Sequence, residues 1–311
     1  MGWKGNVNVK HCSVIIPTLN AGDCIKKLLK SLQSQTILPD EIIVVDSQSE
    51  DDTVVAAASV PGVRVISIER ASFDHGGTRD MALRQSQGEF VVFMTQDAQP
   101  TDEYCLERLL DPFKQERVAA VGGRQIAWPD ARPFERLVRE NNYPAQDRMW
   151  DASDIGRLGV RAYTISDVCA AYRRSAYLQS GGFDYPILTN EDMLMAERLL
   201  HAGYALAYSA GAAVYHSHHF SLRQEYARNY IIGRTMKRYE ERFEHVDETG
   251  EGIALVEKTM RELLRNGHVH ECFFFAANCA ARLLGNRMGR RRETKERLMK
   301  GNANGEERGD S

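Results

Sequence analysis

The stretch SVIIPTLN at residues 13–20 and the stretch EIIVVDSQS at residues 41–49 each begin as an unbroken apolar run and end in polar side chains. Similar short runs recur at residues 63–68, 89–94 and 118–121. Segments of helical periodicity separate these runs, as residues 23–33 do after the first. Continuous apolar strands that alternate with helices favour an α/β fold, with a mostly parallel sheet buried between helices.

The polar side chains that follow the strands are expected at one edge of this sheet, because right-handed crossovers bring the carboxyl ends of parallel strands together. Pro17, Thr18 and Asn20 follow the first strand, and Asp46 and Ser47 end the second. Asp46 can accept from a base N–H or a ribose hydroxyl, so these loops are predicted to bind a nucleoside. The alternative is that Asp46 only caps the next helix.

A candidate metal site follows the fourth strand, in Thr95-Gln96-Asp97-Ala98. A carboxylate fixed at a strand end suits a divalent cation such as Mg²⁺, which leaves its other positions to water and substrate phosphates. His216, with His218 and His219 close behind it, has a spacing that can supply a further ligand. The alternatives are that Asp97 is a turn residue and that the histidines are ordinary core or surface residues.

The segment His75-Gly76-Gly77-Thr78-Arg79 leads into a helix predicted over residues 78–87. Its glycines would let the backbone approach a ligand closely. The helix N-terminus and Arg79 could contact the oxygens of a diphosphate. A Gly-Gly pair is also common in ordinary loops, which is the alternative.

Glu191 and Asp192 begin another predicted helix. A general base must lie near its substrate hydroxyl and be unprotonated at neutral pH. The helix dipole is expected to hold a carboxylate ionised at this position, which makes the two acids candidate catalytic residues. The alternative is that they only favour the dipole.

The composition indicates a soluble globular protein. The 311 residues are 43% hydrophobic and 27% charged, and the net charge of -3 gives no basic field to hold nucleic acid. Six scattered cysteines without a CxxC pair favour reduced core thiols over a disulfide framework. The N-terminus has no apolar core of signal-peptide length, and no run reaches the ~20 apolar residues that span a bilayer. We therefore expect the protein in the cytoplasm, free or attached to the inner membrane face.

The motifs together resemble those of the inverting glycosyltransferase family 2, which has the GT-A fold. They occur in family order, as VIIPTLN (14–20), IIVVDS (42–47), TQDA (95–98) and NED (190–192). The resemblance implies a GT-A catalytic domain over residues 12–220, with a nucleotide-sugar half over about 12–123 and an acceptor half over about 124–220. Around it we expect an N-terminal tail (1–11), a helical C-terminal extension (221–285) and a basic, flexible tail (286–311).

Within this family the chain looks most like the bacterial rhamnosyltransferase branch. The resemblance rests on FDHGGTR (73–79), GRQ (123–125), PFER (133–136), NYP (142–144) and VYHSH (214–218). It implies a dTDP-rhamnose donor and, as acceptor, a growing surface polysaccharide that is often carried on a lipid.

Roles carried over from the family fall on individual residues. Asp46 resembles the acid that contacts the nucleotide base, Asp97 the acid that binds Mg²⁺ or Mn²⁺, and His216 the histidine that helps to hold the metal or the diphosphate. Asp192 resembles the catalytic base, with Glu191 beside it. The remaining positions implied to contact the nucleotide sugar are Pro17, Thr18, Asn20, Ser47, His75, Gly76, Arg79 and Gln96.

The chain departs from the family at two positions. Many relatives have an Asp-x-Asp triplet where Gln96-Asp97-Ala98 supplies only one acid. The resemblance implies that this Gln-Asp-Ala form fits the rhamnosyl branch. Asp80 stands where many relatives have Asn after the arginine.

Three alternatives stay open. The donor could be a UDP-hexose or a UDP-N-acetylhexosamine instead of dTDP-rhamnose. A nucleotidyltransferase of similar layout would need a glycine- and lysine-rich phosphate loop after the first strand, which Pro17-Thr18-Leu19-Asn20 does not provide. A non-catalytic sugar-nucleotide binding module would be expected to have lost the acid at 97 or 192, and both are present.

The C-terminal region suggests a peripheral membrane contact. Its apolar residues Phe273–Phe275, Leu283 and Leu284 lie near the basic residues Arg282, Arg287 and Arg290–Arg292. An amphipathic helix of this composition could bind an anionic lipid surface. The alternative is a helix packed on the catalytic domain with a solvated basic end.

Overall fold

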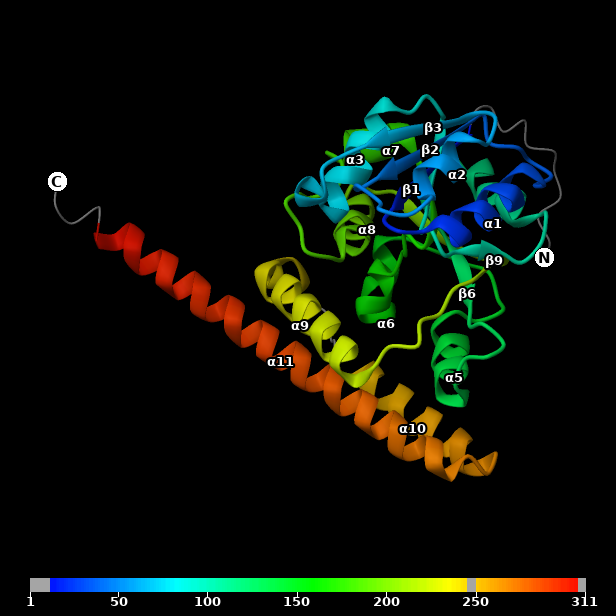
Figure 1. Cartoon of the computed structure of the whole chain (residues 1–311). Helices are drawn as coiled ribbons and strands as arrows, with labels where there is room; N and C mark the ends of the chain where they lie inside the picture. The colour runs from blue at the N-terminus through cyan, green and yellow to red at the C-terminus, as the bar shows by residue number, and fades with distance from the viewer. Residues whose placement is uncertain (1–11, 245–249, 307–311) are drawn as a thin grey trace. The chain divides into compact units, whose positions relative to one another are not determined.

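The computed structural model describes residues 12–244 and 250–306, so the tail expected over residues 1–11 lies outside the described residues. The chain divides into two compact units. The sheet unit holds residues up to 131, residues 135–187 and residues 191–217. The helical unit holds residues 132–134, residues 188–190 and the chain from 218 onward. Figure 1 shows the sheet with its covering helices and, in yellow to red, the helices of the second unit.

The first half of the sheet is parallel, as predicted. Its strands are β1 (Cys12–Thr18), β2 (Glu41–Asp46), β3 (Val63–Ser67) and β4 (Phe90–Met94). They lie in the order β3-β2-β1-β4, and every neighbouring pair is parallel. The side chains of β2 and β4 are almost all buried, which explains their continuous apolar sequence.

The second half of the sheet contains both parallel and antiparallel strand pairs. The sequence predicted a mostly parallel sheet and did not indicate these antiparallel pairs. It contains β8 (Cys169–Arg173), β6 (Val118–Ile126), β9 (Ala205–Tyr215), β5 (Gln99–Pro100) and β7 (Arg148–Trp150). β8 lies antiparallel between β4 and β6, whereas β6 and β9 pair in parallel. The short β5 and β7 pair antiparallel with β9. The α/β class is therefore confirmed with a mixed sheet.

The described part of the sheet unit contains eight α-helices. They are α1 (Gly22–Gln33), α2 (Thr53–Ala58), α3 (His75–Gln85), α4 (Cys105–Leu110), α5 (Pro133–Asn142, whose first residues belong to the helical unit), α6 (Ile155–Leu158), α7 (Arg174–Gln179) and α8 (Glu191–His201). Short 3₁₀ turns span Arg70–Ser72, Asp111–Lys114, Ala152–Asp154 and Gly159–Tyr163 in this unit, and Glu240–Phe243 in the helical unit. α1 buries Ile25, Leu28, Leu29 and Leu32, the face that its periodicity predicts. These side chains join Val14 and other strand residues in one core.

The helical unit is built from α9 (Leu222–Arg238), α10 (Gly250–Arg265) and α11 (Val269–Glu306). α9 and α11 approach closely because glycines line their contact. A Cβ atom on Gly289 would lie 2.0 Å from the carbonyl oxygen of Tyr230, and one on Gly233 would lie 2.2 Å from that of Asn286. Only residues without a side chain allow two helix backbones to come this near.

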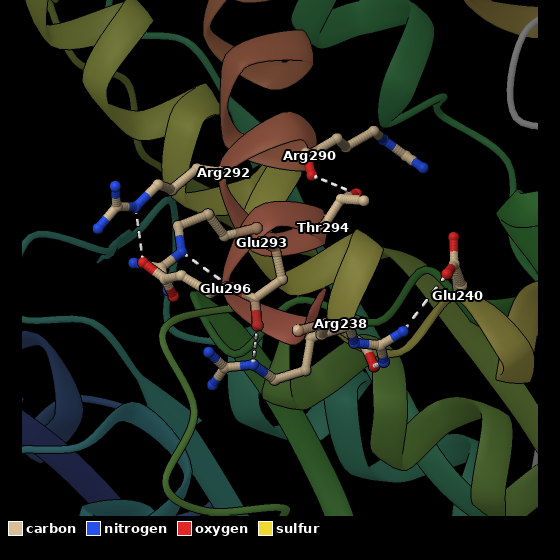
Figure 2. Close-up of polar contacts among 9 residues, drawn as sticks. Arg238, Glu240, Arg290, Arg292, Glu293, Thr294 and Glu296 are labelled. Atoms are coloured by element: carbon tan, nitrogen blue, oxygen red, sulfur yellow. Dashed lines mark hydrogen bonds and ion pairs between the residues drawn. The ribbon is translucent and has the colours of Figure 1, made fainter. Parts of the chain in front are cut away.

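Buried ion pairs extend the same contact toward the end of α11 (Figure 2). The carboxylate of Glu293 is 4% exposed and accepts from Arg234 Nε at 2.9 Å and from Arg238 Nε at 2.8 Å. Burial acts to raise the pKa of Glu293, but the hydrogen bonds from the two arginines outweigh it and lower the pKa. The predicted flexible tail begins at residue 286, inside α11, which is helical as far as Glu306; Glu293, Glu296 and Arg297 of this stretch contact α9. No helix in the described part of the chain is long and apolar enough to cross a membrane.

Candidate functional site

The strand register brings the predicted site residues to one edge of the sheet. Thr18, at the end of β1, is paired with Asp46, at the end of β2. β4 runs parallel to β1, so the segment after Met94 leaves at the same edge. β8 runs the other way and begins with Cys169 opposite Met94, which places the residues before β8 there as well. This edge therefore gathers segments from both halves of the sheet.

The two nucleoside loops are tied together at Asp46. Its side chain is 1% exposed and accepts from the Thr18 hydroxyl at 3.1 Å and from the Ser49 N–H at 2.9 Å. The helix-capping alternative is wrong, because α2 begins only at Thr53 and Asp52 precedes it. Asp46 thus shapes the loop that its own strand enters.

Two further residues of these loops have distinct environments. Asn20 has a left-handed backbone (φ 50°), which Asn tolerates, and its side-chain oxygen accepts from the Glu50 N–H at 2.8 Å. Ser47 is 3% exposed, and its hydroxyl has no hydrogen-bond partner among the residues described. A buried hydroxyl without a partner is costly unless a ligand or water completes it. Ser47 is therefore the loop residue with unused hydrogen-bonding capacity.

Gln96 joins the two strand ends, and Pro17 lies within β1. The Leu19 N–H donates to Gln96 Oε1 at 2.8 Å, and Gln96 Nε2 donates to the Leu19 carbonyl at 3.2 Å. These two hydrogen bonds to the Leu19 backbone occupy the Gln96 side-chain amide. Pro17 pairs with Val45 in the parallel ladder of β1 and β2. Gln96 and Pro17 thus help to hold the loop after β1 at the edge of the sheet.

Asp97 and His216 lie together, as the metal prediction requires. Asp97 Oδ2 is 3.7 Å from His216 Nε2. His216 Nδ1 lies 3.0 Å from Gln125 Oε1, which also accepts from Arg139. Because that oxygen is an acceptor, His216 Nδ1 donates to it, and Nε2 on the side of Asp97 is the nitrogen that a neutral ring would offer to a cation. A carboxylate oxygen and an imidazole nitrogen at this separation fit one divalent cation between them.

Glu191, the first residue of α8, is paired with Arg79. Both residues are nearly buried, at 4% and 5% exposed, and Arg79 Nη1 lies 3.2 Å from Glu191 Oε1. Arg79 Nε is also 3.7 Å from Asp167 Oδ2. The Arg79 guanidinium is directed at these two carboxylates, and its contact with a diphosphate stays a prediction. Arg79 is a partner of the candidate catalytic acids.

Asp192 is half-buried beside this pair. Its Oδ1 accepts from the Met193 N–H at 2.8 Å and its Oδ2 from the Asp167 N–H at 3.3 Å. Burial first, and then the charge of Glu191, raise the pKa of Asp192 to about 7. The expectation that the helix dipole holds it firmly ionised is therefore wrong. A carboxylate that titrates near neutrality matches the optimum for a general base at that pH.

Helix α3 begins at His75, three residues before the predicted start at residue 78, so the two glycines lie inside the helix. The His75 side chain is partly exposed, with Nδ1 3.9 Å from Glu191 Oε1, and burial lowers its pKa. Gly76 is needed for packing, since a Cβ atom there would lie 2.1 Å from the Asp184 carbonyl oxygen. Asp74 begins the helix by accepting from the Gly77 N–H at 2.7 Å. His75 is therefore the residue of this segment that remains accessible near the acids.

Hydrogen bonds on either side of the Ser166–Asp167 peptide connect His216 to Asp192. Gln125, which orients His216, donates through Nε2 to Ser166 Oγ at 2.9 Å. The next residue, Asp167, donates its N–H to Asp192. Sequence reasoning did not assign a role to Asp167, because it stands in a stretch without clear periodicity. Gln125 was noticed only within the GRQ run.

Comparison with known proteins is consistent with this geometry. The family model described as glycosyl transferase family 2 matches residues 13–180. The O-antigen chain rhamnosyltransferase RfbN of Salmonella typhimurium is 37% identical over 222 residues, which cover 71% of each chain. The O-antigen chain rhamnosyltransferase WbaN of Salmonella anatum is 40% identical over 223 residues, covering 71% of this chain and 70% of that one.

Solved structures with the same fold are more distant in sequence. The mannosyltransferase PcManGT from Pyrobaculum calidifontis, in complex with GDP-Man and Mn²⁺, is 18% identical with a TM-score of 0.59, over 88% of this chain and 86% of that one. TarS from S. aureus, residues 1–349 in complex with UDP-GlcNAc, is 16% identical with a TM-score of 0.54, over 92% of both chains. At these identities the likeness concerns the fold alone.

Proposed function

The chain belongs to glycosyl transferase family 2 and has the predicted GT-A fold, and from this premise we propose that it transfers L-rhamnose from dTDP-rhamnose, with inversion, to a hydroxyl of a bacterial surface polysaccharide. The likeness to two O-antigen rhamnosyltransferases over 71% of the chain supports the sugar and the acceptor class. The observation that carries the chemistry is Asp192, a half-buried carboxylate whose pKa is raised to about 7.

Asp192 is the base in this proposal. It takes the proton from the acceptor hydroxyl, and that oxygen attacks the anomeric carbon from the face opposite the diphosphate. The two backbone N–H groups that donate to its oxygens fix the carboxylate for this step. Positioned base catalysis of this kind commonly contributes about 10²–10⁴-fold in rate. The Arg79–Glu191 pair beneath it keeps the start of α8 in place.

Asp97 and His216 would hold the divalent cation, Mg²⁺ or Mn²⁺, which supplies positive charge to the leaving dTDP. Their separation of 3.7 Å and the orientation of His216 by Gln125 support this assignment. Thr18, Asp46 and Ser47 lie at the ends of the neighbouring strands and would contact the nucleoside. The Ser47 hydroxyl is the donor and acceptor with capacity left for it.

A nucleotide-sugar screen tests the donor. Because a ligand that binds only the folded state raises its melting temperature by mass action, the shift ranks candidate donors. We expect dTDP-rhamnose with Mg²⁺ or Mn²⁺ to give the largest shift, and chelation with EDTA to reduce it. A larger shift with UDP-glucose or UDP-N-acetylglucosamine would replace the donor assignment. Binding without any release of dTDP from dTDP-rhamnose would favour the non-catalytic module.

We also propose that the exposed face of α11 contacts an anionic lipid surface. Phe273 is 75% exposed and Leu284 is 55% exposed. Arg287 and Arg291 lie on the same helix, are exposed, and form no hydrogen bond or ion pair within the described part of the chain. Apolar side chains beside uncompensated arginines suit the boundary between acyl chains and anionic head groups.

The structure narrows the residues that could take part. Phe275 is 1% exposed and packs against the ring of Phe134, so it belongs to the core of the helical unit. Arg292 is paired with Glu296, with 2.6 Å between Nε and Oε1 (Figure 2). Arg290 donates to the Asn286 side chain at 3.1 Å. These residues are therefore less available to lipid than Arg287 and Arg291.

Flotation with vesicles that contain phosphatidylglycerol tests this contact. Replacing both Arg287 and Arg291 with Gln, or Phe273 with Ser, should reduce the fraction of protein that floats. The matched controls are Arg292→Gln, whose charge is paired, and Val55→Ser, an exposed apolar residue of α2. Equal flotation of all four variants would contradict the lipid contact, as would no flotation of the wild type.

A further inference from the structure

Asp167 links the protein core to the candidate base. It lies two residues before the start of β8, and its side chain is 3% exposed. The Tyr172 hydroxyl donates to Asp167 Oδ1 at 2.8 Å, and Tyr172 is itself fully buried. On its other side, the Asp167 N–H donates to Asp192 Oδ2. A movement of Asp167 would therefore be transmitted to the Asp192 carboxylate.

Three carboxyl groups share one cation in this cluster. Glu191 takes the nearer contact with Arg79, at 3.2 Å, and Asp167 the longer one, at 3.7 Å. His75 adds no second positive charge at neutral pH, because burial lowers its pKa. The neighbouring phenols of Tyr172 and Tyr177 stay neutral, since burial raises the pKa of each. With every carboxyl ionised, the buried cluster would carry two uncompensated negative charges.

Burial decides which carboxyl group avoids that charge. Asp167 is more buried than Asp192, and its Oδ2 has no hydrogen bond among the residues described. Asp192, in contrast, receives two backbone N–H groups. An ionised carboxylate in a low-dielectric interior is disfavoured when one of its oxygens has no donor, as Asp167 Oδ2 has none within the described part of the chain. Burial first, and then the charge of Asp192, raise the pKa of Asp167 well above its ordinary value.

We propose that Asp167 is a positioning residue for Asp192. In the cluster of Asp167, Glu191, Asp192 and Arg79, Asp167 is the acid that keeps its proton at neutral pH, and its backbone N–H holds the Asp192 carboxylate. A neutral Asp167 lets Asp192 ionise without a second negative charge beside it. The inference rests on the proposed function only for the role given to Asp192, because the protonation of Asp167 is a property of the folded chain.

The first test needs no substrate. Asp167→Asn replaces a neutral acid with a neutral amide of the same shape. A carboxyl group with a raised folded-state pKa gives stability that is complete below its unfolded pKa and is lost as the pH rises through its folded pKa. The melting temperature of Asp167→Asn minus that of the wild type should therefore increase from about pH 5 to about pH 8.

A control of opposite sign is available in Asp154, whose pKa is lowered by its hydrogen bond with Arg157. For Asp154→Asn the same difference in melting temperature should fall or stay level as the pH rises. If the difference for Asp167→Asn is flat or falls over this range, Asp167 is ionised in the folded protein and the proposal is overturned.

The second test is kinetic and follows the release of dTDP from dTDP-rhamnose. Asp167→Asn should keep kcat within about threefold of wild type, with the same pH midpoint. Asp167→Ala loses the bond from Tyr172, so kcat should fall about tenfold with KM for the donor unchanged, a loss that Asn rescues. Full activity in the Ala variant, or a shifted pH midpoint in the Asn variant, would overturn the positioning role.

The failure of this inference can be distinguished from the failure of the proposed function. If Asp192 is not the base, Asp192→Asn stays active, while the pH dependence of the Asp167→Asn melting temperature is unaffected. If Asp167 is not protonated, the melting experiment shows it even when Asp192→Asn is inactive.

Discussion

Arg79 and Glu191 form a buried ion pair, with 3.2 Å between Nη1 and Oε1, and the pair lies directly beside Asp192. One residue comes from α3 and the other from α8. The pair therefore joins the segment that includes His75 to the helix that begins with the candidate base. In the proposed mechanism the arginine would act on the chemistry through these acids.

Arg79→Ala should destabilise the protein and shift its pH profile. Removing one partner of a buried ion pair commonly costs about 3–5 kcal/mol, because the other charge stays buried. The charge of Arg79 lowers the pKa of Asp192, so without it the midpoint of kcat against pH should move to higher pH. Urea unfolding and a pH–rate profile measure the two effects.

The matched control is Arg117→Ala, whose guanidinium is 57% exposed in its pair with the Asp151 carboxylate, itself 35% exposed. We expect a much smaller loss of stability there, as for other exposed pairs. A change in donor KM alone for Arg79→Ala, with an unmoved pH midpoint, would support the diphosphate role that the sequence suggested.

The rate of transfer should rise with pH through neutrality. Asp192 acts as a base only when it is ionised, and its pKa is raised to about 7. Below that value the carboxyl is protonated and kcat falls in proportion. Release of dTDP at saturating donor, measured from acid to mildly alkaline pH, gives the midpoint. A midpoint near the ordinary value of an aspartate would contradict the environment described for Asp192.

Loss of either candidate metal ligand should weaken donor binding only when a cation is present. Asp97→Ala and His216→Ala are each expected to lower the affinity for dTDP-rhamnose in Mn²⁺ by roughly 10–100-fold, the range seen when metal-site residues are changed. In EDTA the variants and the wild type should bind alike. Calorimetry measures both. Asp52→Ala and His201→Ala change the same residue types on the surface, at half or more exposed side chains.

Unaltered affinity of both variants in Mn²⁺ would count against the Asp97–His216 assignment. His218, two residues further along the chain, is the next donor that the sequence offers, and His218→Ala belongs in the same series.

Variants of Ser47 and Asp46 should affect different properties: donor affinity for Ser47→Ala and stability of the fold for Asp46→Ala. Ser47→Ala removes a hydroxyl that has no partner in the described residues, so the melting temperature without ligand should hardly change. Donor affinity should fall severalfold, because a hydrogen bond to the ligand contributes about 1 kcal/mol. Asp46→Ala instead removes the acceptor of the buried Thr18 hydroxyl and of the half-buried Ser49 N–H, which costs about 1–3 kcal/mol of stability. A Ser47→Ala variant with normal donor affinity would show that the nucleoside does not use this hydroxyl.

The helical unit depends on the close contact between α9 and α11. Gly289→Ala places a Cβ atom 2.0 Å from the Tyr230 carbonyl oxygen, so the helices must separate and the melting temperature should drop. Overpacking of this kind typically costs about 1–3 kcal/mol. Gly252→Ala in α10 meets nothing within 4 Å and should be neutral or slightly stabilising. Equal melting temperatures of the two variants would mean that the contact yields without cost.

The parallel half of the sheet could be predicted because its strands are buried on both faces. EIIVVD and EFVVFM have no alternation, and turn or polar residues end each run. Since parallel strands end at one edge, the proximity of Thr18, Asp46 and Gln96 followed from the topology. The antiparallel insertion of β8 could not be foreseen, because its partners β4 and β6 are distant in sequence.

The electrostatic state of the candidate site could not be predicted from the sequence either. Asp192 at a helix start suggests a lowered pKa, but burial and Glu191 outweigh the dipole. Arg79 beside two glycines suggests a phosphate ligand, but the fold turns it toward Glu191 and Asp167. Both outcomes depend on burial by segments remote in sequence, which local patterns do not encode.

The account is tested most directly by Asp192→Asn, compared with the wild type for dTDP-rhamnose binding in Mn²⁺ and for the release of dTDP with water as acceptor. We predict unchanged donor affinity and dTDP release at least about 100-fold slower, since the amide cannot take the proton. Release at the wild-type rate by the asparagine variant would contradict the role of Asp192 and, with it, the mechanism proposed for this chain.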